Sequence, residues 1–380
     1  MLIKPEIERF AKIKVVGVGG AGGNVLNTLI ESQQIVGVEY VAVNTDAQDL
    51  SKNKAFVKLP IGQEITNGLG SGANPEIGRK AAEESRDLIQ SNLENSDMVF
   101  ITAGMGGGTG TGAAPVVASI ARELGALTVA VVTKPFNFEG SQRRENAENG
   151  LVQLKREVDA LIIIPNQKLL EIADEGMSVI DAFRVSDSVL SQGVQGISDL
   201  IMMPGTINVD FADVKTVMKN AGSALMGIGV GTGEGRAVLA ARAAISSPLL
   251  ENNIDGAKGI LFNVVGGSDL GMREVDDAAR VINTSASPDA NIIFGYRVDP
   301  SLNDQVKITV IATGFEQEDE LIRSRMNLDA LKRKDPEGLQ ELRPKTNKNE
   351  EVSTDKEKKQ NQNIDDDSEL YDIPAFLREN

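Results

Sequence analysis

Short apolar segments alternate with helical patterns along the first half of the chain. Strands are expected at 13–18, 38–43, 98–102, 128–133 and 160–164. The first strand is followed by a helix from about Asn24, and a helical pattern covers 74–91 with Pro75 in its first turn. A further helix ends near Leu124. Strands that alternate with helices predict an α/β fold with a parallel, doubly wound sheet.

The second half begins with a pattern typical of one long helix, at 178–202. Beyond it, helices are expected at 211–220, 234–246 and 270–283, and strands at 223–230, 258–265, 292–298 and 306–312. This alternation predicts a second, smaller α/β domain, with the long helix between the two.

The composition changes after Phe315. Residues 317–363 are rich in charged and amide side chains, their acidic and basic residues balance, and too few are apolar to offset the cost of ordering the backbone. Apolar residues return at Leu370–Arg378, after an acidic run. That segment is either a frayed terminus or a short recognition segment that folds on a partner. The predicted division is 1–177, 178–204 (the central helix), 205–316, 317–363 (a disordered linker) and 364–380.

The composition excludes several functions. A formal net charge of −16 argues against a nucleic-acid binder and against adsorption to anionic membranes. The absence of Cys and His removes thiolate and imidazole chemistry, but phosphoryl transfer depends mainly on positioning and electrostatics. No apolar run reaches the ~18–20 residues that span a bilayer, and the N-terminus has no signal-peptide pattern. We therefore expect a cytoplasmic protein.

The strongest local signal is the segment Gly104–Gly112, which holds six glycines and lies between a strand and a helix. So many glycines are costly to order, which makes sense where backbone N–H groups must line a phosphate at a helix N-terminus. Thr109 and Thr111 add hydroxyl donors. Because no Lys follows, as it would in a Walker A loop, charge neutralisation falls on backbone dipoles and Mg²⁺.

A second glycine-rich segment, Gly17–Gly23, follows the first strand and fits the dinucleotide fingerprint G-x-G-x-x-G. Its glycines could instead serve close packing of strand and helix. Two such loops at the carboxyl ends of neighbouring strands could embrace one di- or triphosphate.

Two further constellations have both a functional and a purely structural reading. Phe183 and Asp187 share one face of the long helix, where they could stack on a guanine base and accept its N–H groups, or be a core ring and a solvated carboxylate. Asn208, Asp210 and Asp213 could bind a cation or orient a water molecule, or the aspartates could cap the next helix.

Together these segments resemble the FtsZ family of bacterial tubulin-like cell-division GTPases. The resemblance covers roughly residues 10–315 and the last dozen residues. It is carried by AGMGGGTGTGAAPVVA (103–118), NVDFADV (208–214), NTDAQDL (44–50), GSGANPEIG (70–78) and DIPAFLR (372–378). It implies a tubulin-like fold: a Rossmann-like GTP-binding domain, a central helix, a C-terminal GTPase-activating α/β domain and a disordered tail.

The resemblance also implies a set of site residues. The phosphates of GTP or GDP would be held by Gly20, Ala21, Gly22, Gly23, Asn24, Gly104, Gly106, Gly107, Gly108, Thr109, Gly110, Thr111 and Gly112. Glu139 and Arg143 would contact the ribose and nearby base, Phe183 would stack on guanine, and Asn166 and Asp187 would hydrogen-bond it. Mg²⁺, with a monovalent cation, would be the cofactor, with unknown protein ligands.

The resemblance further implies how the protein works. Asn208, Asp210 and Asp213 would act in trans, entering the nucleotide site of the next subunit and polarising the attacking water. Such a heterologous contact propagates as an open filament. Leu370–Arg378 would bind division proteins, including membrane tethers, at the division site on the inner face of the membrane, since the chain lacks its own anchor.

Two rival functions are weaker. An NAD-dependent oxidoreductase would use the Gly17–Gly23 loop, with Glu39 or Asp46 on the ribose, but would leave Gly104–Gly112 without a role. A GTP-binding scaffold without hydrolysis would not need Asp210 and Asp213.

Overall fold

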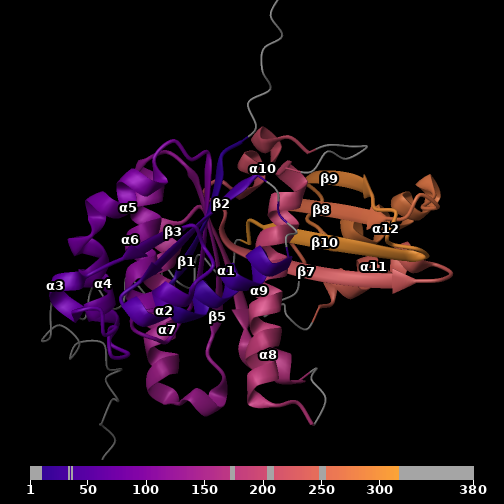
Figure 1. Ribbon diagram of the computed structural model, residues 1–380. Helices are drawn as coiled ribbons and strands as arrows, with labels where there is room; N and C mark the ends of the chain where they lie inside the picture. Colours follow the sequence, from indigo (N-terminus) through magenta and orange to yellow (C-terminus); the bar gives the residue numbers. More distant parts are fainter. Residues whose placement is uncertain are drawn as a thin grey trace, which may run out of the picture. The chain divides into compact units, whose positions relative to one another are not determined.

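The structure, a computed structural model, describes residues 11–32, 35, 37–171, 176–202, 209–247 and 254–315. Its strands form one ten-stranded sheet in the order β3-β2-β1-β4-β5-β6-β7-β10-β8-β9 (Figure 1). They are β1 (Ile13–Val18), β2 (Val38–Asn44), β3 (Val57–Pro60), β4 (Met98–Gly104), β5 (Leu127–Lys134), β6 (Ala160–Pro165), β7 (Gly222–Thr232), β8 (Gly259–Gly266), β9 (Asn291–Val298) and β10 (Gln305–Thr313). The predicted linker and terminal segment, 317–380, lie outside the described residues.

The helices connect and cover these strands. They are α1 (Gly19–Ser32), α2 (Ala47–Lys52), α3 (Gln63–Thr66), α4 (Pro75–Glu84), α5 (Arg86–Leu93), α6 (Thr109–Glu123), the 3₁₀ turn η1 (Asn137–Glu139), α7 (Ser141–Glu157), α8 (Asn166–Glu171), α9 (Val179–Met202), α10 (Phe211–Met218), α11 (Arg236–Ile245) and α12 (Met272–Ser285). Among the helices that the structure describes, none is long and apolar enough to cross a membrane.

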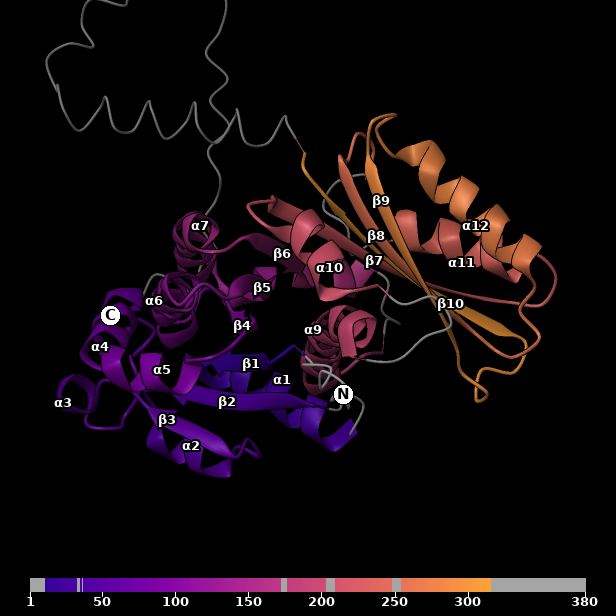
Figure 2. The ribbon, with the colours of Figure 1, turned by 90° about the horizontal axis from the view of Figure 1, so that it is seen from above.

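The first six strands are parallel and have a core on each face. Side chains alternate between the faces of a strand, so in β1 Ile13 and Val15 pack with α1 and α9, whereas Val16 and Val18 pack with α4 to α6. Figure 2 shows these two helix layers from above. The predicted doubly wound arrangement is confirmed for this part.

The sheet continues into the second half, where its strands are mixed in direction. β7 pairs with β6 in parallel, but β10 inserts between β7 and β8 and is antiparallel to both. The reason is that only residues 299–304 separate β9 from β10, and parallel strands need a long crossover. Helices α11 and α12 cover one face of this part around a third core (Figure 2). The α/β fold class is confirmed.

The long predicted helix is α9, which has 24 residues. Its buried face, including Leu190, Val194 and Ile197, belongs to the same core as Met226 of β7 and Ile311 of β10. The helix therefore packs against both halves of the sheet, and Figure 2 shows it between them.

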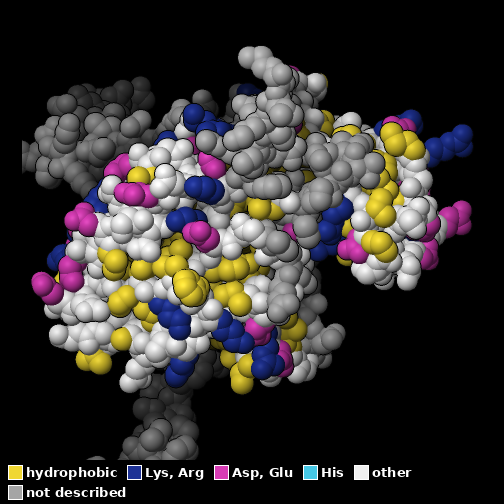
Figure 3. Space-filling view, turned by 45° about the horizontal axis from the view of Figure 1, so that its top comes forward, with side chains coloured by type: hydrophobic (Ala, Val, Ile, Leu, Met, Phe, Trp, Pro, Cys, Tyr) yellow, Lys and Arg dark blue, Asp and Glu magenta, His cyan; other side chains and the backbone are white. Residues whose placement is uncertain are grey.

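Charge is mixed on the surface. On the face in Figure 3, the described Lys and Arg side chains are interspersed with acidic and apolar ones and form no continuous basic stripe.

Candidate functional site

The two glycine-rich loops meet at one edge of the sheet. β1 and β4 are parallel neighbours with Val18 opposite Ala103, so the loops that follow them are adjacent. Gly19 opens α1 with a φ of +73°, and a Cβ there would lie 3.0 Å from the backbone nitrogen of Gly110. This close approach of two backbones requires glycine.

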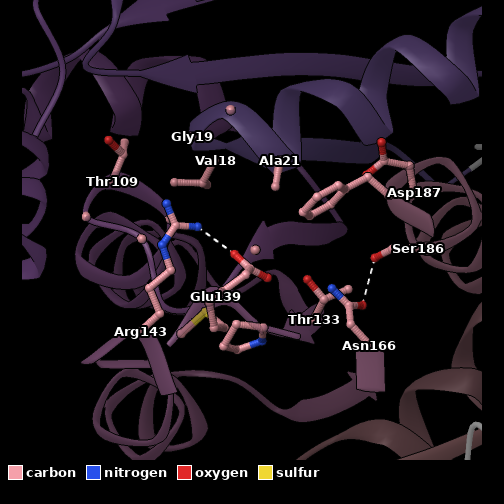
Figure 4. Close-up of a pocket in the computed structure, with 18 of the residues that line it drawn as sticks. Val18, Gly19, Ala21, Thr109, Thr133, Glu139, Arg143, Asn166, Ser186 and Asp187 are labelled. Carbon is pink, nitrogen blue, oxygen red and sulfur yellow. Dashed lines mark hydrogen bonds and ion pairs between the residues drawn. The ribbon is translucent and has the colours of Figure 1, made fainter. Parts of the chain in front are cut away.

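A cleft lies over this edge (Figure 4). Twelve of the residues singled out in the sequence line it: Gly20, Ala21, Gly104, Gly107, Gly108, Thr109, Gly110, Glu139, Arg143, Asn166, Phe183 and Asp187. The structure thus brings together both loops, the η1–α7 region and the start of α9.

Six other predicted phosphate contacts do not line the cleft: Gly22, Gly23, Asn24, Gly106, Thr111 and Gly112. Two of them have a clear packing role, because a Cβ on Gly22 would lie 2.4 Å from the Thr102 carbonyl oxygen and one on Gly112 would lie 1.9 Å from that of Pro75. Thr111 supports the loop, since its Oγ1 accepts from the Gly106 N–H at 2.8 Å.

The start of α6 is held by hydroxyl groups. Thr109 Oγ1 lies 2.7 Å from Thr45 Oγ1 and 3.0 Å from Ser71 Oγ, and all three side chains are buried. These hydrogen bonds join the end of β2 and the 67–72 loop to the Gly104–Gly112 loop. Thr109 therefore has a fixed position at a helix N-terminus, where an anion is favoured.

The opposite end of the cleft suits a flat, hydrogen-bonding group. Phe183 and Asp187 lie one turn apart on α9, as the sequence predicted. Burial raises the pKa of the Asp187 carboxyl to about 7. Asn166 is buried at the start of α8, where its Oδ1 accepts from Ser186 Oγ at 2.8 Å (Figure 4). A carboxylate beside an aromatic ring can accept paired N–H donors from a stacked base.

Glu139 and Arg143 lie between these two ends. Arg143 donates to Glu139 Oε2 at 2.6 Å, and the Phe136 N–H donates to Glu139 Oε1 at 2.9 Å (Figure 4). The carboxylate is thus oriented by two donors, and the guanidinium keeps further N–H groups for a ligand.

Asp210 and Asp213, the acidic residues of the predicted activating loop, lie outside the cleft. Asp210 is the N-cap of α10, where its side chain accepts from the Asp213 N–H at 2.9 Å. The carboxylate of Asp213 is exposed in the first turn of that helix. Neither lines the cleft. Asn208 lies outside the described residues.

Seven further residues line the cleft: Val18, Gly19, Ser71, Met105, Thr133, Pro135 and Ser186. Val18, Gly19 and Met105 belong to the two predicted glycine-rich segments, whereas the other four were not predicted as site residues. Thr133 and Pro135 could have been found, because β5 is the next parallel strand and its carboxyl end reaches the same edge. Ser71 belongs to a segment that was noted only as part of the resemblance.

No group of three or more potential metal-ligating side chains occurs among the residues that the structure describes. Glu139 and Asp187 are the carboxylates that line the cleft. The hydroxyls of Ser71 and Thr109 are hard oxygen donors, so the site fits Mg²⁺ where phosphate oxygens and water supply the other ligands.

The free energy of unfolding should distinguish glycines that pack against backbone, such as Gly112, from glycines that line the cleft, such as Gly107. Gly112→Ala is expected to lower the free energy of unfolding by about 1–3 kcal/mol through overpacking against α4. Gly107→Ala is expected to change it by less than about 0.5 kcal/mol, because a Cβ at Gly107 meets nothing within 4 Å. Urea unfolding without nucleotide measures the free energy of unfolding of both variants. Equal values for Gly112→Ala and Gly107→Ala would contradict the packing role of Gly112.

Comparisons with known proteins place this cleft in a family context. The model for the Tubulin/FtsZ family GTPase domain matches residues 12–174, and that for the FtsZ family C-terminal domain matches 222–316. An empty FtsZ dimer from M. jannaschii has 48% sequence identity and a TM-score of 0.78, over 82% of this chain and 90% of that chain. CetZ1 from Haloferax volcanii, a GDP-bound monomer, has 23% identity and a TM-score of 0.71, over 84% and 99%. CetZ2 from the same organism, a protofilament with bound GTPγS, has 22% identity and a TM-score of 0.69 over the same shares, so the CetZ proteins share the fold.

Proposed function

Because the chain belongs to the FtsZ family of tubulin-like GTPases, we propose that it polymerises head-to-tail into filaments that form a ring at the division site and recruit other division proteins. GTPase activity and a cytoskeletal role in cell division come with membership of the family. A relative solved as a dimer and a more distant one solved as a protofilament support self-association.

The proposed ligand is GTP or GDP, bound across the whole cleft. Its phosphates would lie against Gly20, Ala21, Gly104 and Gly107–Gly110, and the other residues of 20–24 and 104–112 would shape the two loops. Its ribose would lie beside Glu139 and Arg143, and its base against Phe183. Asp187 and Asn166 would hydrogen-bond the guanine. Residues 1–177 would thus bind the nucleotide, and residues 205–316 would supply the activating loop.

The observation that carries the head-to-tail proposal is the separation of Asp210 and Asp213 from the cleft of their own subunit. Phe183 and Asp187 lie near the start of α9, whereas Asp210 and Asp213 belong to α10, which follows the far end of α9. At 1.5 Å per residue, the 24 residues of α9 extend over about 36 Å. Figure 1 has α8 near one end of α9 and α10 near the other. In trans, Asn208, Asp210 and Asp213 of the next subunit would reach the terminal phosphate and orient the attacking water.

Mg²⁺ is the proposed metal cofactor, together with a monovalent cation. The ion would supply positive charge to offset the phosphate charge that no loop lysine neutralises. The chain's own contribution would be the hydroxyls of Thr109 and Ser71 and the N–H groups of the two loops.

The C-terminal segment Leu370–Arg378 is the proposed attachment site for division proteins, including those that tether the filament to the inner face of the cell membrane. We expect deletion of residues 370–380 to leave GTP hydrolysis and assembly of the purified protein within about twofold, because neither the cleft nor the proposed activating residues Asp210 and Asp213 belong to this segment. In cells, the same deletion should abolish recruitment to the division site. Loss of assembly in vitro would assign the segment to the polymer interface instead.

The direct test follows phosphate release and sedimentation together. With GTP, hydrolysis per subunit is expected to rise with protein concentration and to track the sedimented fraction, because each active site needs two subunits. GDP should support neither. Activity per subunit that stays constant down to dilutions without assembly would contradict the shared site.

A further inference from the structure

Three phenylalanine rings meet beside the base end of the cleft. Phe136 and Phe138 stack on one another, with ring centroids 5.0 Å apart and an angle of 13° between the planes. Phe183 is nearly perpendicular to both, at 88° and 89°, with centroid distances of 5.2 and 6.3 Å. These distances lie within the range of favourable aromatic pairs. The plane of the Phe183 ring is therefore defined by two contacts from η1 and its N-cap.

The backbone around Phe138 is anchored on both sides. The Asn137 N–H donates to Gln167 Oε1 at 3.1 Å, and Arg144 donates to Asn137 Oδ1 at 2.7 Å. On the other side, Glu139 is held by the Phe136 N–H and by Arg143. Phe138 is thus fixed by its neighbours although its side chain is 58% exposed.

The two supporting rings differ in their burial. Phe136 is fully buried and belongs to the interior, so its contact with Phe183 is part of general packing. Phe138 contributes little to the core, and its described ring contacts are those with Phe136 and Phe183. Phe138 is thus an exposed phenylalanine in an anchored turn, directly beside the Phe183 ring that lines the cleft.

We propose that Phe138 is a positioning residue for the base: with Phe136 it holds Phe183 in the orientation that stacks on guanine. This inference rests on the proposed nucleotide site. It requires that Phe138 act through Phe183 and not through the phosphates or the subunit contact.

The test measures nucleotide affinity by calorimetry at a dilution without assembly. Phe138→Ala is expected to weaken GTP and GDP about two- to tenfold, the range that corresponds to one aromatic pair. Phe138→Tyr should bind as the unmodified protein does. Binding of inorganic tripolyphosphate, which has no base, should not change. Phe56→Ala is the matched control, since Phe56 is 99% exposed and does not line the cleft.

A double-mutant cycle decides whether the effect passes through Phe183. In a Phe183→Ala background, Phe138→Ala should cause no further loss. An equal loss in that background would overturn the proposal, and so would unchanged GTP affinity together with defective assembly, which would make Phe138 a subunit contact. Failure of the unmodified protein to bind GTP would refute the proposed function itself.

Discussion

Replacing Asp213 with alanine is expected to leave GTP binding intact and to reduce GTP hydrolysis by about 10²–10³-fold, as the loss of one electrostatic or positioning group typically does. The side chain is exposed and does not line the cleft of its own subunit, so binding should not depend on it. Its backbone N–H, which donates to Asp210 Oδ1 in the cap of α10, is retained in the variant. Calorimetry for affinity and phosphate release for turnover are the two measurements.

Asp87→Ala provides a matched control for Asp213→Ala. Asp87 is also exposed in the first turn of an eight-residue helix, α5, so both substitutions remove a carboxylate from a helix N-terminus. The control should retain hydrolysis. Equal activities of the two variants would remove Asp213 from the reaction.

Guanine-nucleotide affinity is expected to fall as the pH decreases from 8 to 6, and Asp187→Asn should abolish this dependence. Burial raises the pKa of Asp187 to about 7, so the free protein carries a partly protonated carboxyl at neutral pH. A base that donates two N–H groups favours the ionised form, which lowers the pKa in the complex and releases a proton on binding. Affinity should therefore decrease by up to about tenfold per pH unit below 7 and level off above about 8.

At pH 8, Asp187→Ala should also lose a hydrogen bond to a charged group. Such bonds contribute ~1.5–3 kcal/mol, or about ten- to 150-fold in affinity. The other carboxylate in the cleft, Glu139, is paired with Arg143, and Asp181→Asn removes an exposed carboxylate from the same helix as a control. Calorimetric titrations at pH 6, 7 and 8 that show one affinity for unmodified protein would place Asp187 outside the base contact.

The sequence predicted most strands because their apolar runs are continuous. The bounds of β1 agree with the prediction, and those of β8 and β10 differ by one residue at each end. Helix α7 was missed, since its buried face is only the narrow stripe of Ala147, Gly150, Leu151 and Leu154 among charged side chains. The pattern over 74–91 is two helices, separated at Ser85.

Local signals also misplaced one helix start. Glycine has low helix propensity, so α1 was expected from about Asn24, but it begins at Gly19. The packing of Gly22 against Thr102 and Gly17 explains this start, because a helical turn made of glycines can approach the sheet closely. That contact depends on the neighbouring strand and is not visible in a local pattern.

The cleft was predictable where glycine backbone lines it, as at Gly104 and Gly107–Gly110. It was less predictable where the fold brings distant segments together. Ser71 reaches Thr109 from a loop whose position depends on positive φ at Gly68, Gly70 and Gly72. Likewise, the Phe136–Phe138 pair meets Phe183 only through tertiary packing.

The measurement that tests the shared active site most directly mixes two inactive variants. Asp213→Ala retains the cleft but lacks the acidic group. Gly107→Asp retains the acidic loop but has a carboxylate where the phosphates would lie, and a Cβ at Gly107 meets nothing within 4 Å. In an equimolar mixture, roughly one contact in four pairs an intact cleft with an intact acidic loop. Phosphate release well above the sum of the two separate variants is the predicted result. A mixture that only reaches that sum would contradict the proposal that the next subunit completes the site.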